Sequence, residues 1–226
     1  MPARPVLALA KAEGVTLTMY LTALFFESIR RSSGGPGTAR TMSASVPVNL
    51  RQFFPSTSAR NFFATIRVEH TFGRGDDSPA AIARGLQEAF AQEATPEALE
   101  QRLRRLIRVE RLPVARIVPR PLKDVLLGLI NRVNNRGLTV AISNLGRATL
   151  PEPAESHVGR MAFHVSAVRP QFCAMSHGGL LTLSFTSPFV ESDHVRDYAR
   201  MLTEAGIEVS VSAARVTEEE LAEVGS

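Results

Sequence analysis

The residues best suited to chemistry lie in one short stretch, from Ser143 to Gly146, which follows an uncharged β-branched run. Ser143 offers a hydroxyl and Asn144 an amide, so the pair supplies hydrogen-bond donors and acceptors at the end of an apolar segment. Gly146 allows backbone angles and close approaches that a side chain would forbid. This combination fits a small binding site, and it also fits an ordinary transition from a strand to a turn.

The five histidines are the other residues that could act as a base or a metal ligand. They are His70, His157, His164, His177 and His194. His194 lies between Asp193 and Asp197, which is typical of a charged helix N-terminus. A general base needs an orienting partner and a place beside the substrate, and sequence proximity establishes neither. No spacing resembles a metal site, so no catalytic histidine and no metal is predicted.

Length and composition indicate a globular chain with a core. The sequence has 226 residues, of which 44% are hydrophobic. A net charge of +4, two Tyr and no Trp argue against nucleic-acid binding. The apolar neighbours of Cys173, the single cysteine, favour a buried structural residue over a reactive thiol. The longest apolar run, residues 17–26, is too short to cross a membrane, so we expect a cytoplasmic protein without a membrane span.

Hydrophobic periodicity predicts the elements that position these residues. Helices are predicted over residues 6–12, 16–31, 95–111 and 119–133, with further helix starts at Ser78 and Ser192. Strands are predicted over residues 41–50, 61–72, 138–146, 159–167, 170–177, 180–187 and 207–211. The strand that reaches Ser143 carries no charge, so we expect it to be buried on both faces. Because strands and helices do not alternate regularly, the predicted fold is α/β (α+β), with a mixed, largely antiparallel sheet covered by helices.

Four motifs occur in a fixed order along the chain. They are TLTMYLTA at residues 16–23 after KAEG at 11–14, VPVNLR at 46–51, RNFF at 60–63 and TVAISNLG at 139–146. In this order and spacing they resemble the second half of a condensation-domain-like acyltransferase, over almost the whole chain. The superfamily includes chloramphenicol acetyltransferase, the dihydrolipoyl acyltransferases, the condensation domains of peptide synthetases and bacterial alcohol acetyltransferase-like proteins. The resemblance is nearest to the last group.

The resemblance implies a fold of two similar α/β lobes with a substrate tunnel between them. Residues 1–226 would form a single domain equivalent to the C-terminal lobe, with a core of about 6–212 and an acidic tail at 213–226. The general base of this family is the second histidine of an HHxxxDG motif in the first lobe. This sequence contains no such motif, so we expect the N-terminal lobe to be absent and the chain to be inactive alone.

The resemblance also implies roles for four residues. Ser143 and Asn144 match the Ser-Asn motif of the family, which implies a part in the tunnel wall or in stabilising an oxyanion. Arg51 and Asn61 match motifs near strand ends, which implies substrate binding, but the residues themselves favour a structural ion pair for Arg51 and a turn for Asn61. No bound cofactor is expected, because acyl-CoA or an acyl-carrier thioester would be a substrate.

The expected function is therefore the C-terminal part of a thioester-dependent acyltransferase that acts on an alcohol or an amine. The missing motif leaves open whether the chain is itself an enzyme, and the alternative is a non-catalytic module that binds an acyl chain, a carrier or a protein. A basic nucleic-acid-binding protein is disfavoured by the modest charge. An isolated lobe would expose apolar surface, so we expect a homo-oligomer or a complementary N-terminal lobe.

Overall fold

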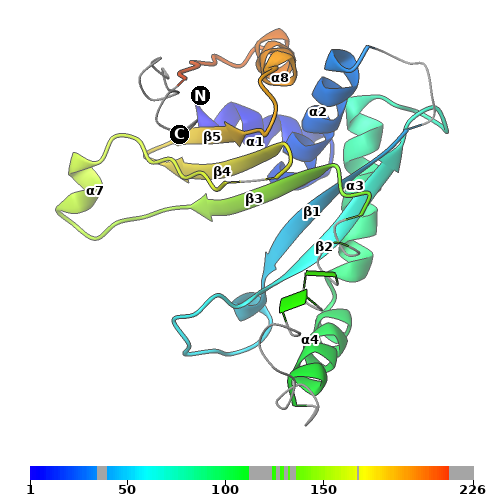
Figure 1. Ribbon diagram of the computed structural model, residues 1–226. Helices are drawn as coiled ribbons and strands as arrows, with labels where there is room; N and C mark the ends of the chain where they lie inside the picture. The colour runs from blue at the N-terminus through cyan, green and yellow to red at the C-terminus, as the bar shows by residue number, and fades with distance from the viewer. Residues whose placement is uncertain are drawn as a thin grey trace, which may run out of the picture.

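A mixed sheet of five strands organises the molecule (Figure 1). The computed structural model describes residues 1–34, 40–111, 136–166 and 168–213, and also residues 124, 125, 128, 129 and 132. The strands are β1 (Thr41–Asn49), β2 (Phe63–Thr71), β3 (Val140–Arg147), β4 (Gln171–His177) and β5 (Leu180–Thr186). In space their order is β2-β1-β3-β4-β5. The two outer pairs are antiparallel and the two inner pairs are parallel, which confirms the predicted mixed sheet.

The described helices are α1 (Ala3–Ala12), α2 (Leu17–Ser32), α3 (Pro79–Glu93), α4 (Pro96–Arg111), α7 (Ala154–His157) and α8 (Asp193–Glu204), with a 3-10 turn η1 (Leu50–Gln52) after β1. Three of them, α2, α3 and α4, begin at a side chain that caps them. The Thr16 hydroxyl accepts a hydrogen bond from the Met19 amide (3.4 Å) at the start of α2, and Ser78 does the same for the Ala81 amide (3.3 Å) at the start of α3. Among the described residues, no helix has both the length and the apolar character needed to cross a bilayer.

The core lies between the sheet and the helices on one of its faces. Phe25, at the middle of α2, is fully buried, and its ring centroid lies 5.4 Å from that of Phe172 in β4 and 6.0 Å from that of Tyr198 in α8. Both pairs are edge-to-face, the arrangement that aromatic rings favour. Side chains of α1, α2, α3 and α8 join the same hydrophobic cluster, so these helices share one face of the sheet.

The opposite face of the sheet is free of helices in the described part of the chain. Because side chains alternate along a strand, this face carries the residues between the core positions. They include Ser45 in β1, Ala141 and Ser143 in β3, and Ser184 in β5. The prediction that β3 is buried on both faces is therefore wrong: Val140 and Ile142 are buried, whereas Ala141 and Ser143 are only half-buried.

Two predicted strands are not strands. Residues 159–166 form no hydrogen-bonded ladder with a described strand. The Thr186 hydroxyl of β5 donates a hydrogen bond to the Val165 carbonyl (3.0 Å), which connects this segment to the sheet. Residues 207–211 leave α8 with Ile207 buried but Val211 68% exposed, and no strand pairs with them in the described part. Both segments have β-forming residues, but a strand also needs a partner. The predicted helix at 119–133 and the tail at 213–226 lie mostly outside the described residues.

Candidate functional site

The four residues singled out by the sequence come to one edge of the sheet. β1 and β3 are parallel, so their carboxyl ends point to the same edge. Ser143 and Asn144 lie in β3, whereas Arg51 and Asn61 flank the connection from β1 to β2. The two strands pair over only two residues each and then diverge toward this edge (Figure 1). In the described structure, no hydrogen bond or ion pair joins Arg51 or Asn61 to the residues of β3.

Asn144 ties the end of β3 to the start of α2. Its Nδ2 donates a hydrogen bond to the Thr18 hydroxyl (2.9 Å), and its Oδ1 accepts one from the Gly146 amide (2.8 Å). Both ends of the side-chain amide are therefore engaged, on the face that the helices cover. The backbone of Gly146 has φ +73°, a left-handed conformation that glycine tolerates better than other residues. This geometry gives Asn144 a structural function.

Ser143 faces the other way. Ser143 directly precedes Asn144 in the strand, so its side chain projects from the helix-free face, opposite Cys173 of β4 in the ladder. Ser143 is half-buried, and its hydroxyl makes no side-chain hydrogen bond within the described residues. Cys173 is buried beside it, as the sequence predicts. The structure thus separates the Ser-Asn pair and leaves the Ser143 hydroxyl as the group that can meet a ligand.

Arg51 holds the connection between β1 and β2 together. Its Nη2 donates hydrogen bonds to the carbonyl oxygens of Ser58 and Arg60, both at 2.6 Å. The guanidinium carbon also lies 6.0 Å from the centroid of the Phe62 ring, within the range of a cation–π contact. Backbone carbonyls thus take the place of the carboxylate that an ion pair would need. Arg51 is exposed and shapes the loop beside the sheet edge.

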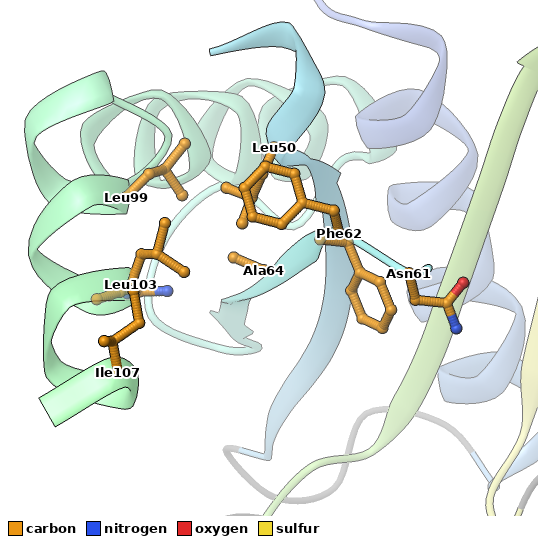
Figure 2. A pocket seen from close by; sticks show the side chains of 9 residues that line it. Leu50, Asn61, Phe62, Ala64, Leu99, Leu103 and Ile107 are labelled. Carbon is orange, nitrogen blue, oxygen red and sulfur yellow. The ribbon is translucent and has the colours of Figure 1, made fainter. Parts of the chain in front are cut away.

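An apolar groove lies between α4 and the start of β2 (Figure 2). Its volume is about 220 Å³. The lining residues are Leu50, Asn61, Phe62, Phe63, Ala64, Leu99, Arg102, Leu103 and Ile107. Leu99 and Leu103 turn toward β2, as their helical spacing predicts, whereas the exposed Asn61 points its amide away from α4 (Figure 2). Arg102 stands at the side of the groove and donates to the Thr65 carbonyl (3.0 Å).

Known proteins resemble this chain in fold and not in sequence. No family model and no curated protein matches the sequence. Polyketide synthase associated protein 5 from Mycobacterium tuberculosis is similar with a TM-score of 0.52 and 11% identity, over 88% of this chain and 47% of that one. The epimerization domain from the third module of tyrocidine synthetase B is similar with a TM-score of 0.52 and 10% identity, over 89% of this chain and 44% of that one. A structure that describes condensation domain-mediated chain release from the enacyloxin polyketide synthase is similar with a TM-score of 0.46 and 16% identity, over 96% of this chain and 42% of that one.

The chain has a condensation-like fold. It spans less than half of each of these three structures, 47%, 44% and 42% of their lengths. Identities this low show the arrangement of the elements alone. What the condensation-like lobe does must therefore be argued from its own residues.

The histidines of the condensation-like lobe are all described, and none forms a recognisable catalytic group. His70 Nε2 lies 2.9 Å from the Asp77 carboxylate, which also accepts the Gly73 amide, so this pair closes the turn before α3. His164 is exposed and not in a strand, contrary to the expectation of a sheet residue. His157 Nδ1 lies 2.8 Å from the carbonyl oxygen of Pro153, the residue before α7. Within the described ranges, no three His, Cys, Asp or Glu residues come close enough to hold a metal ion.

The sequence did not predict the buried position of His194. His194 is 8% exposed and lines a cleft of about 630 Å³ at the amino ends of β1, β3 and β4, the opposite edge from Ser143. Burial lowers its pKa, and the Asp193 carboxylate opposes this effect. The charged neighbours of His194 predict a charged helix N-terminus, which gives no indication that the imidazole is buried. The informative signal was the helical stripe of His194, Tyr198, Met201 and Leu202, all of which are buried.

Proposed function

We propose that the chain is the C-terminal part of a thioester-dependent acyltransferase, which moves an acyl group from acyl-CoA or an acyl carrier to an alcohol or an amine. The observation that carries the proposal is the Ser143 hydroxyl. It projects from the helix-free face of a condensation-like sheet, close to the edge where β1 and β3 diverge. A hydroxyl in such a place can donate to an oxygen that becomes negatively charged during the reaction.

The reaction requires one donor of this kind and one base. The acceptor oxygen or nitrogen attacks the thioester carbonyl, whose oxygen takes the negative charge of a tetrahedral intermediate. The intermediate collapses as the carbon–sulfur bond breaks, and the proton lost by the acceptor passes through the base to the departing thiolate. Ser143 donates to the oxyanion in this scheme, and a histidine of a complementary HHxxxDG lobe acts as the base.

The same sheet edge offers a surface for such a lobe. Leu145 is 58% exposed at the end of β3, and Phe63 is 54% exposed at the start of β2. Arg51 fixes the loop between β1 and β2, and the Asn61 amide is directed away from α4. Exposed apolar side chains surrounded by polar groups are typical of protein interfaces. In the proposed enzyme, Arg51 and Asn61 shape the substrate entrance that the two lobes form together.

The test is transfer of radiolabelled acetyl from acetyl-CoA to a panel of alcohols and amines. The chain alone should be inactive, and the chain joined to an HHxxxDG lobe should transfer the label. In the joined protein, Ser143→Ala should reduce kcat roughly a hundredfold, the usual effect of removing one oxyanion donor. Ser184→Ala, a matched hydroxyl on the same face of β5, should have little effect. Full activity of Ser143→Ala, or transfer by the chain alone, would refute the proposed role.

A second candidate function is a non-catalytic module that binds an acyl chain. The groove between α4 and β2 favours it, because a cavity of about 150 Å³ lined by Leu, Ile and Phe is known to bind a small apolar molecule and this one is larger. Calorimetry with acyl-CoA of increasing chain length discriminates the two. Affinity that rises with chain length and is abolished by Leu103→Arg would favour the binding module, whereas affinity governed by the CoA moiety would not.

A further inference from the structure

A long arm leaves the sheet between β3 and β4. We define the arm as residues 148–158, which carry α7 and project away from the sheet (Figure 1). Ala148, where the arm begins, donates its amide to the Ser176 carbonyl (2.8 Å). The body of the arm is largely exposed, so few contacts hold it.

His177 lies between the two ends of this arm. It is the last residue of β4 and is 2% exposed. Its Nδ1 lies 3.2 Å from the Ala148 carbonyl oxygen, and its Nε2 lies 2.8 Å from the Val158 carbonyl oxygen. One buried ring therefore contacts the first and the last residue of the arm.

Both neighbours of the ring are hydrogen-bond acceptors. A neutral imidazole has a single N–H, so it can donate to one carbonyl while the lone pair of its other nitrogen faces the second. An imidazolium has two N–H groups and satisfies both. The protonation state of His177 thus decides whether both ends of the arm are held.

The charges around the ring favour the imidazolium form of His177. Glu155 of α7 places a carboxylate oxygen 3.8 Å from Nδ1. On the neighbouring strand, the residue opposite His177 is Leu180, which is uncharged. The amino group of Met1 also lies on this hairpin, where it donates to the Leu181 carbonyl (3.3 Å). The hydrogen bond with the Val158 carbonyl raises the pKa of His177 most, followed by the bond with the Ala148 carbonyl. The negative charge of Glu155 also raises this pKa, whereas burial lowers it.

We propose that His177 is a positioning residue whose imidazolium clamps the arm and thereby fixes the carboxyl end of β3, which carries Ser143. Loss of the proton releases one carbonyl and loosens the arm. The consequence for Ser143 rests on the proposed function, whereas the clamp itself does not.

The direction of the pH dependence follows from the raised pKa. The folded arm binds the proton more tightly than the unfolded chain does, so the stabilisation is complete below the ordinary histidine pKa of about 6.5. It is lost as the pH rises through the pKa of the folded state. Protection of the arm should fall roughly tenfold for each unit by which the folded pKa exceeds the unfolded one.

Two measurements on the chain test the clamp without any assay of activity. Nitrogen-15 NMR of the imidazole should show both ring nitrogens of His177 protonated at pH 6 and a titration above the ordinary histidine value. Hydrogen exchange of residues 148–158, corrected for the intrinsic rate, should accelerate over the same pH range. A neutral, single-tautomer His177 from pH 5.5 to 8.5, or arm protection that does not change with pH, would overturn the proposal.

Variants separate the clamp from the rest of the fold. His177→Gln should leave the arm weakly protected at every pH, because a glutamine amide cannot place donors at both carbonyls. His164→Gln, which replaces an exposed histidine, should retain the wild-type pH dependence. Should His177→Gln fail to fold, the NMR titration and exchange of the unmodified chain still decide the matter. An inactive transferase together with a pH-dependent arm would refute the proposed function and leave the clamp in place.

Discussion

The hydrogen bond between Asn144 and Thr18 gives the sharpest prediction for the fold. In Asn144→Ala, two bonds are lost, the 2.9 Å bond to the Thr18 hydroxyl and the 2.8 Å bond from the Gly146 amide. A typical hydrogen bond contributes about 0.5–1.5 kcal/mol to the free energy of unfolding. Gly146 is exposed, so water can replace its lost partner, whereas Thr18 is half-buried. We therefore expect a loss of about 1–2 kcal/mol, the lower half of the range of about 1–3 kcal/mol for two bonds.

A double-mutant cycle measured by urea denaturation tests this reasoning. Thr18→Ala and Asn144→Ala should each destabilise the chain, and the double variant should lose less than the sum, with a coupling of about 1 kcal/mol for residues that share a bond. Ser143→Ala, the adjacent residue on the opposite face, serves as a control that should change stability little. Strict additivity of the two variants would show that the bond contributes nothing, and that Asn144 is available for another role.

Three further predictions concern other parts of the chain. Burial raises the pKa of Glu27, but the hydrogen bonds and charges of two arginines in the same helix outweigh burial and lower it. Stability measured against pH should therefore be full above the ordinary pKa of glutamate and fall as the pH drops through the lowered value, and Glu27→Gln should remove this dependence. In Arg51→Met the loop of residues 53–60 should exchange amide hydrogens faster, because two carbonyls lose their donor, while the exchange of α3 stays unchanged. Light scattering should detect self-association of the chain that Phe63→Ser weakens, and a strict monomer at all concentrations would count against an apolar docking edge.

Signals confined to a few neighbouring residues predicted structure well. Thr16 and Ser78 cap α2 and α3 because the hydroxyl and the amide that it accepts are only three residues apart. The turn at residues 177–179 between β4 and β5 follows from glycines whose φ values of +55° and +82° other residues rarely adopt. In such cases the sequence contains both partners of the interaction.

Some predictions that depend on a distant partner were wrong. Residues 159–166 have strand-forming side chains, but the ladder positions beside β4 are occupied by β3 and β5. The burial of His194 depends on Phe25, whose ring centroid lies 6.0 Å away although the residue is far away in the sequence. Ser143 and Asn144 form one motif in the sequence, yet strand alternation sends them to opposite faces. The contacts of Arg51 with two carbonyls carry no sequence signal, because any residue supplies a carbonyl.

β1 and β3 are paired over only two residues each, so a small change in the angle between them displaces the far end of β3. The paired end is fastened by Ser43, which is buried, donates its hydroxyl to the Gly137 carbonyl (2.6 Å) and accepts the Thr139 amide at its own carbonyl (3.0 Å). From the last paired residue to the tip of β3 the strand extends about 20 Å, at about 3.3 Å per residue. A change of only about 5° in the angle between β1 and β3 would then move the tip of β3 by roughly 2 Å, more than the length of a carbon–carbon bond. The separation of the strand tips therefore depends on the angle that β1 and β3 make at their paired end, and we expect a substitution at Ser43 to change that separation without contacting the tips.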